Sequence, residues 1–173
     1  MIWSRSGGRY CPKAAGLRRS ELAALQLEDV DRESGRVQVR RGKGRKGRIT
    51  YLPPSALPAL EDWIAARSEE AGPLLRPVRK GGRIAQRGMS AQAIRDLCLR
   101  LAGLAATAPW SPHDARRTWT GDLLDASGDL SIAQQLAGHS SPATTARYDR
   151  RPEATRRQAA AQLHVPYVRP TSG

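Results

Sequence analysis

A tyrosine that is followed and preceded by basic side chains is the feature of this sequence best suited to chemistry. Tyr148 stands nine residues after His139, and an upstream cluster contains His113 and Arg116. Attack on a phosphodiester needs a nucleophile, cations on the non-bridging oxygens and a proton donor for the leaving alkoxide. A phenol, two imidazoles and guanidinium groups supply these types, so the sequence suggests a site that acts on phosphodiesters.

Each of these residues also has a simpler interpretation. A free phenol has a pKa of about 10, so Tyr148 would need a neighbouring cation or base, such as His139, to become a nucleophile. It could equally be a half-buried surface tyrosine. His113 and Arg116 share a face on a helix and could bind one phosphate, or could mark a solvated helix start. Arg117 is expected at the surface or on a DNA backbone.

The residues that could bind a metal or a cofactor are scattered. No grouping of Asp, Glu and His resembles a two-metal site, so the cations of the site are expected to be side chains, and arginine suits a phosphate because its planar fork bonds two oxygens. Cys11 and Cys98 are too far apart for a zinc site or a disulfide framework. Cys98 is expected in the core, and no metal or cofactor is predicted.

The charge of the chain favours a polyanionic partner. Lys and Arg number 29 against 16 Asp and Glu, a net charge of +13. Such an excess binds nucleic acid by releasing counterions from phosphates, although a merely soluble basic surface would have the same composition. No segment has the ~18 consecutive apolar residues of a membrane span, and no signal peptide is evident. We therefore expect a cytoplasmic, nucleoid-associated bacterial protein without a membrane partner.

The pattern of elements predicts a mainly α fold with a small antiparallel sheet, of the α+β class. Ser20 would cap a helix to about Gln26, and a hairpin would pair 36–41 with 48–53. Leu74, Leu75 and Val78 would add a third edge strand. Further helices are expected over 55–71, 90–104 with Ser90 as cap, 113–126, 130–137 and 153–163. The expected domain covers 16–165, with a poorly ordered basic segment at 1–15 and a flexible tail at 166–173.

Two basic residues outside these clusters, Lys43 and Arg18, also allow both a role in the site and a simpler interpretation. Lys43 lies on the turn of the predicted hairpin, from which a long side chain can reach a cleft. Lys46 is its rival, and the whole turn could instead be a solvated contact to DNA backbone. Arg18 is isolated in sequence, and nothing in its spacing marks it as more than a surface arginine.

Taken in order, these segments resemble the catalytic domain of the tyrosine recombinases, the phage integrase family. The resemblance covers about residues 15 to 165 and consists of five ordered motifs. They are Gly16-Leu17-Arg18-Arg19-Ser20-Glu21-Leu22, Gly42-Lys43-Gly44, His113-Asp114-Ala115-Arg116-Arg117-Thr118, Leu136-Ala137-Gly138-His139-Ser140, and Tyr148.

The resemblance implies a DNA breaking-rejoining fold and a role for each motif residue. Arg18 and Arg116 would clamp the scissile phosphate, and Lys43 would protonate the departing 5′ oxygen. Tyr148 would attack the phosphate, which leaves a 3′-phosphotyrosyl link and a free 5′-hydroxyl.

Three further residues would assist this reaction. His113 would help proton transfer, His139 would hydrogen-bond the phosphate, and Glu21 would support the geometry of the site. Neither metal nor ATP would be needed.

The resemblance also implies partners. The substrate would be double-stranded DNA, bound by a tetramer of protomers, with no small-molecule substrate. The family's N-terminal DNA-clamping domain has no room in this sequence. The alternatives are a truncated, non-catalytic DNA-binding remnant and a type IB topoisomerase; an RNA-binding module ranks last, because no aromatic platforms are evident. The helix at 153–163 is expected to pack on a neighbouring protomer or on its own domain.

Overall fold

The computed structural model describes residues 15–40 and 47–163. It is mainly helical, with one two-stranded antiparallel sheet in the described part, which confirms the predicted fold class. The elements are α1 (Arg19–Ala24), the 3-10 turn η2 (Leu27–Asp29), β1 (Arg36–Val39), β2 (Arg48–Tyr51), the 3-10 turn η4 (Pro54–Ala56), α2 (Leu57–Arg67), α3 (Ala91–Leu104), α4 (Pro112–Ser127), α5 (Leu130–Ala137), α6 (Pro142–Ala146) and α7 (Glu153–Ala161).

The hairpin forms where it was predicted, although both strands are shorter. Val37 pairs with Thr50 in an antiparallel register, and both side chains are buried. β2 ends at Tyr51, just before a leucine and Pro53, which has no N–H to continue a ladder. The turn at 41–46, with Lys43 and Lys46, lies outside the described residues.

The predicted third edge strand is wrong. In the described residues this segment makes only isolated bridges, Gln26 with Pro73 and Val78 with Ile84. The Leu74 N–H donates to the Leu25 carbonyl at 2.9 Å, so it ties the segment to the chain that follows α1. Pro73 cannot donate, and a continuous ladder cannot extend through it.

Two predicted helix boundaries are also wrong. Ser20 lies inside α1 rather than at its cap, because the Glu21 carboxylate accepts the Arg18 backbone N–H at 2.7 Å and starts the helix earlier. α2 ends at Arg67 instead of residue 71, since Ser68 adopts a left-handed φ of +77°. The helices predicted over 90–104, 113–126 and 130–137 form as α3, α4 and α5.

The apolar core lies in the N-terminal region, which we define as the described residues from 15 to 107. There α1 packs against α3, and Cys98 of α3 is buried as predicted. The core cluster consists of Ala15, Leu17, Leu22, Leu25, Val30, Val37, Val39, Trp63, Leu74 and Ile94. This cluster forms a rigid support for the first site motif.

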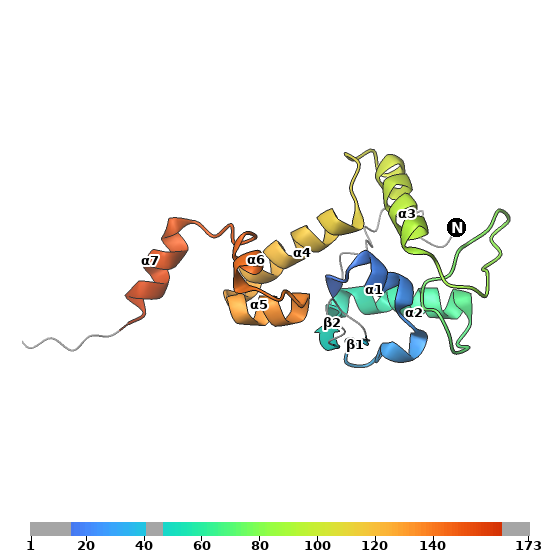
Figure 1. Cartoon of the computed structure of the whole chain (residues 1–173), viewed down its shortest axis with the longest axis horizontal. Coiled ribbons are helices and arrows are strands. Elements are labelled where there is room, and N and C mark those ends of the chain that lie inside the picture. The colour runs from blue at the N-terminus through green and yellow to red at the C-terminus, as the bar shows by residue number, and fades with distance from the viewer. Residues whose placement is uncertain (1–14, 41–46, 164–173) are drawn as a thin grey trace, which may run out of the picture.

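The C-terminal region, residues 112–148, is a smaller group of helices. α5 packs on α4, on α6 and on β2 of the N-terminal region. Figure 1 shows α4 extending from the side of α3 toward α5 and α6. The buried side chains here are mostly small, among them Ala115, Thr120, Leu124, Ala133, Ala137 and Thr145.

α7 projects beyond α5 and α6, away from the two regions (Figure 1). Most of its described side chains are exposed, and Leu163, two residues beyond the helix, is 76% exposed. Packing of this helix on its own domain, one of the two expectations, is therefore not what the structure shows. None of the described helices is both long and apolar enough to cross a membrane.

Candidate active site

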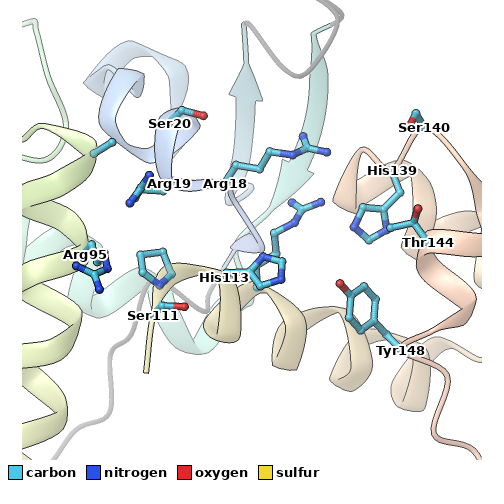
Figure 2. A pocket seen from close by; sticks show the side chains of 13 residues that line it. Arg18, Arg19, Ser20, Arg95, Ser111, His113, His139, Ser140, Thr144 and Tyr148 are labelled. Atoms are coloured by element: carbon cyan, nitrogen blue, oxygen red, sulfur yellow. The ribbon is translucent and has the colours of Figure 1, made fainter. Parts of the chain in front are cut away.

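A cleft of about 680 Å³ lies between the N-terminal and C-terminal regions. Figure 2 shows side chains from α1, α3, α4 and the segments around α6 facing this space. Five predicted site residues line it: Arg18, His113, Arg116, His139 and Tyr148. The motifs lie as far apart as residues 18 and 148 in sequence, so the fold brings them together. Lys43 lies outside the described residues, and Glu21 is buried behind the lining.

Arg116 is the most buried cation of the cleft. It lies one turn into α4, is 6% exposed and donates to two backbone carbonyls, those of Gly16 and Ala137, the latter at 2.6 Å. Burial, and then the positive charges of Arg18 and Arg48, lower the pKa of Arg116 to about 10. The guanidinium therefore stays charged at neutral pH, with its position fixed by the two carbonyls.

The glycine that opens the first motif is needed for a close approach. Gly16 has φ of +59°, and a Cβ there would lie 2.2 Å from the ring of Trp119 on α4. Leu17 is buried in the core, so the next residue, Arg18, is directed toward the cleft. The sequence pattern Gly-Leu-Arg thus joins α4, the core and the cleft in three successive residues.

Glu21 holds Arg18 in place. Its carboxylate accepts from Arg18 Nη1 at 2.8 Å, and Arg18 Nη2 donates to the Gly138 carbonyl at 2.6 Å. Burial alone would raise the pKa of Glu21, but hydrogen bonds from Arg48 and Arg18 outweigh it and lower the pKa to about 2. Glu21 is therefore a carboxylate at any physiological pH, and its supporting role in the site stays a prediction.

Arg48 is a site residue that the sequence reasoning missed. Its Nη1 and Nη2 donate to the two Glu21 oxygens at 2.7 and 2.9 Å, and its Nε donates to the Leu136 carbonyl at 2.9 Å. The alternation in β2 gives no signal for it, because the apolar residues of the strand face outward. Ile49 and Tyr51 are 38% and 48% exposed, so the opposite face, with Arg48, points inward.

His139 and Tyr148 form the C-terminal side of the cleft. The ring centroids lie 5.9 Å apart, and His139 Nδ1 lies 2.9 Å from the Thr145 hydroxyl. Burial, then the charges of Arg116, Arg18 and Arg48, lower the pKa of His139 to about 4. His139 is therefore neutral near pH 7 and can accept or donate a single hydrogen bond toward the cleft.

His113 and two further arginines complete the rim. His113 is an exposed residue in the first turn of α4, whose cap is Ser111. Arg19 and Arg95, which sequence reasoning did not single out, line the opposite wall (Figure 2). No carboxylate is among the lining residues in the described ranges, and no group of three or more potential metal ligands occurs there. The cleft is suited to an anion held by side chains.

Comparison with known proteins gives a consistent result. The pattern of the phage integrase family matches residues 13–154. The tyrosine recombinase XerC of Shewanella amazonensis is 38% identical over 137 residues, which are 78% of this chain and 45% of that protein. XerC of Corynebacterium efficiens is 41% identical over 138 residues, covering 78% and 42%. The chain thus spans less than half the length of these curated relatives.

A solved structure supports the fold. The XerA recombinase matches with a TM-score of 0.70 and 27% identity, over 90% of this chain and 56% of the other. Other recombinase structures match at lower identity, including XerH bound to difH substrate, with a TM-score of 0.63 and 22% identity. These lower likenesses establish the fold.

Proposed function

Because the chain belongs to the phage integrase family, we propose that it is the catalytic part of a tyrosine-type site-specific recombinase that cuts and rejoins DNA. The observation that supports this most is the position of Tyr148. Its phenol shares one arginine-lined cleft with Arg18 and Arg116. The Arg18 guanidinium comes from the N-terminal region, and the Arg116 guanidinium comes from α4. A hydroxyl nucleophile and a cationic phosphate site are the two parts that phosphoryl transfer requires.

The first step is attack of the Tyr148 oxygen on the scissile phosphorus. The P–O5′ bond breaks as the new P–O bond forms, which leaves a 3′-phosphotyrosine and a 5′-hydroxyl. His113 assists removal of the phenol proton, and Lys43 donates a proton to the 5′ oxygen. Neutral His139 hydrogen-bonds the phosphate, and its low pKa, about 4, keeps it in that state through the neutral range.

The two arginines stabilise the charge that grows on the non-bridging oxygens. Arg116 and Arg18 are already held by backbone carbonyls and by Glu21, so little reorganisation is needed when the phosphate enters. Loss of one such donor in a preorganised site reduces the rate by a factor on the order of 10²–10³. The convergence of these residues in one cleft supports a catalytic protein over a non-catalytic remnant.

Rejoining follows by the reverse chemistry. The 5′-hydroxyl of another strand attacks the phosphotyrosine, which retains the energy of the original bond, so neither ATP nor metal is required. The partners we propose are duplex DNA and further copies of the protein, four of them in the recombining complex. Its place of action is the bacterial nucleoid, in the cytoplasm.

The test is formation of a covalent protein–DNA adduct. Nicked suicide duplexes from the DNA that flanks the gene are incubated with the chain, and with the chain extended by its upstream reading frame, and resolved on a denaturing gel. We expect an adduct that disappears in Tyr148→Phe and persists in Tyr51→Phe, a matched control on β2. Salt-sensitive binding without an adduct in either form would favour the DNA-binding remnant.

A further inference from the structure

The carboxyl end of α5 binds three arginines from three different parts of the chain. A helix leaves its last carbonyls without intrahelical partners, and cations are favoured there. At this end the Gly138 and His139 N–H groups satisfy the carbonyls of Gln134 and Gln135. The next three carbonyls, those of Leu136, Ala137 and Gly138, accept from Arg48, Arg116 and Arg18 respectively.

Arg48 differs from the other two arginines in where its donors point. Arg18 and Arg116 line the cleft, whereas Arg48 is not among the lining residues of the described chain. Its side chain is only 10% exposed, and its three hydrogen bonds go to Glu21 and Leu136. The Arg48 guanidinium, which connects β2, α1 and α5, therefore lies outside the space that a phosphate would occupy.

We propose that Arg48 is a positioning residue for this active site. Through Glu21 it fixes the direction of Arg18, and through the Leu136 carbonyl it holds the end of α5 from which His139 faces the cleft. It acts on groups that contact the phosphate without contacting DNA itself. The proposal rests on the proposed function for what these groups bind, while the positioning itself is a property of the free protein.

The backbone at Gly138 is shaped to receive this side chain. Gly138 has φ of +66°, and a Cβ there would lie 2.7 Å from Arg48 Cδ and 2.9 Å from its Nε. The guanidinium end therefore lies directly against the residue that precedes His139. A glycine is required both by the left-handed turn and by the close approach of Arg48.

No other side chain can make the same three bonds. A lysine could neutralise Glu21, but its single nitrogen cannot span two carboxylate oxygens and a carbonyl in one plane. A glutamine at this position would leave Glu21 buried with Arg18 as its remaining ion-pair partner in the described chain. Loss of one partner of a buried charge pair is strongly destabilising, so the experiment needs a second variant that removes the carboxylate as well.

The test measures His139 in the free protein by NMR. The groups around its ring are the Thr145 hydroxyl, the Tyr148 ring and the three arginines. Arg48→Gln should raise the pKa of His139 from about 4 toward 6.5, because one nearby positive charge is lost and because the end of α5, no longer held, leaves the ring less buried. The indole N–H of Trp63, bonded to Leu74, reports whether the core is intact.

Arg40→Gln is the matched control. Arg40 follows β1, the other strand of the hairpin, and pairs with Asp29 and Glu28, and it does not line the cleft in the described structure. It should leave His139 unchanged. If Arg48→Gln does not fold, the double variant Glu21→Gln/Arg48→Gln replaces it, and the same His139 shift is expected because the Leu136 bond is still lost.

A second measurement separates positioning from DNA binding. With saturating protein, Arg48→Gln should slow single-turnover adduct formation by a factor on the order of 10² while the Kd for duplex changes by less than about threefold. Arg48→Lys should recover part of the rate. An unchanged His139 pKa in the folded variant would overturn the proposal. If the parent protein forms no adduct while the pKa of His139 is shifted in Arg48→Gln, the result counts against the proposed function and leaves the positioning role standing.

Discussion

The N-terminal and C-terminal regions are held together internally in different ways. The N-terminal region buries large apolar side chains such as Trp63 and Ile94, whereas the C-terminal region buries mainly alanine and threonine. The two regions are joined at the end of α5 by arginine-to-carbonyl hydrogen bonds. Close packing of large side chains makes the N-terminal region rigid. The C-terminal region buries small groups and is joined to it by charged hydrogen bonds, so it can separate from the N-terminal region at a lower cost in free energy.

The difference matters because the chemistry needs both regions. Arg18 and Glu21 belong to the N-terminal region, and His139 and Tyr148 belong to the C-terminal one. The proposed phosphate site is therefore complete only while the end of α5 is docked. Variants that affect the docking should change catalysis more than variants of comparable stability effect in the core.

The largest effect is expected from Arg116→Gln. This change removes two bonds, which join α4 to the Gly16 turn and to α5, and also the proposed phosphate ligand. Adduct formation should fall by a factor on the order of 10²–10³, and the free energy of unfolding by about 1.5–3 kcal/mol. Single-turnover gels and urea unfolding measure the two quantities.

Arg117→Gln is the control for this comparison. Arg117 is exposed on the same helix, so its loss should leave the unfolding free energy within about 0.5 kcal/mol. Equal adduct rates for the Arg116 and Arg117 variants would show that the buried arginine is not a phosphate ligand.

A smaller effect is expected from Gly138→Ala. The added Cβ meets Arg48 and the backbone is left-handed, so we expect a loss of about 1–3 kcal/mol in unfolding free energy. Gly103 lies on α3, where an added Cβ would meet no atom within 4 Å, so Gly103→Ala should instead stabilise the protein by about 0.5–1 kcal/mol. Thermal unfolding of both variants compares the two regions, and equal effects would contradict the account.

The next prediction concerns acid. His139 has a folded pKa of about 4 against an ordinary 6.5, and Glu21 about 2 against 4.5. In both cases the unfolded chain binds more protons between the two values, so stability falls as pH falls. The loss of stability as pH falls from 6.5 to 4 should come from His139, and the loss from pH 4.5 to 2 should come from Glu21.

Urea titrations at several pH values would follow this loss. In His139→Gln the decrease in stability between pH 6.5 and 4 should become shallower, whereas the decrease that Glu21 causes at lower pH should remain. A stability that is flat from pH 6.5 to 4 in the parent protein would contradict the buried, neutral state assigned to His139.

The smallest effect is expected at the segment that follows Tyr148. Arg150 donates to Asp122 and Asp125 of α4 at 3.3 and 3.2 Å, and all three side chains are exposed. Such pairs contribute about 0–1 kcal/mol. Arg150→Gln should leave the unfolding free energy within that range and adduct formation within about twofold. A large drop in rate would mean that this pair holds the nucleophile.

Much of the fold followed from local signals in the sequence. Ser90 caps α3 as predicted, and Gly138 ends α5 in a left-handed conformation. The ordered motifs identified five residues that do line one cleft. Capping and turns succeed because they are determined within a few residues, whereas the grouping of the distant motifs came from the family resemblance.

The errors and omissions share a physical cause. Ser20 was displaced as a cap by the Glu21 carboxylate, and the third strand was replaced by bonds from Leu74 to the chain after α1. Arg48 was missed because its partner Leu136 lies 88 residues away. Local patterns do not reveal which distant carbonyl an arginine will bond, and the apolar residues of β2 face outward, so its alternation does not place Arg48 inside.

The most direct test of the central claim is to identify the residue and the DNA end that become linked. The adduct would be digested with trypsin and a nuclease and the remaining peptide analysed by mass spectrometry. We predict that the nucleotide is attached through its 3′ phosphate to Tyr148, in a peptide that begins after Arg147. A link at another residue, or through a 5′ phosphate, would contradict the assignment of Tyr148 as the nucleophile aimed into this cleft.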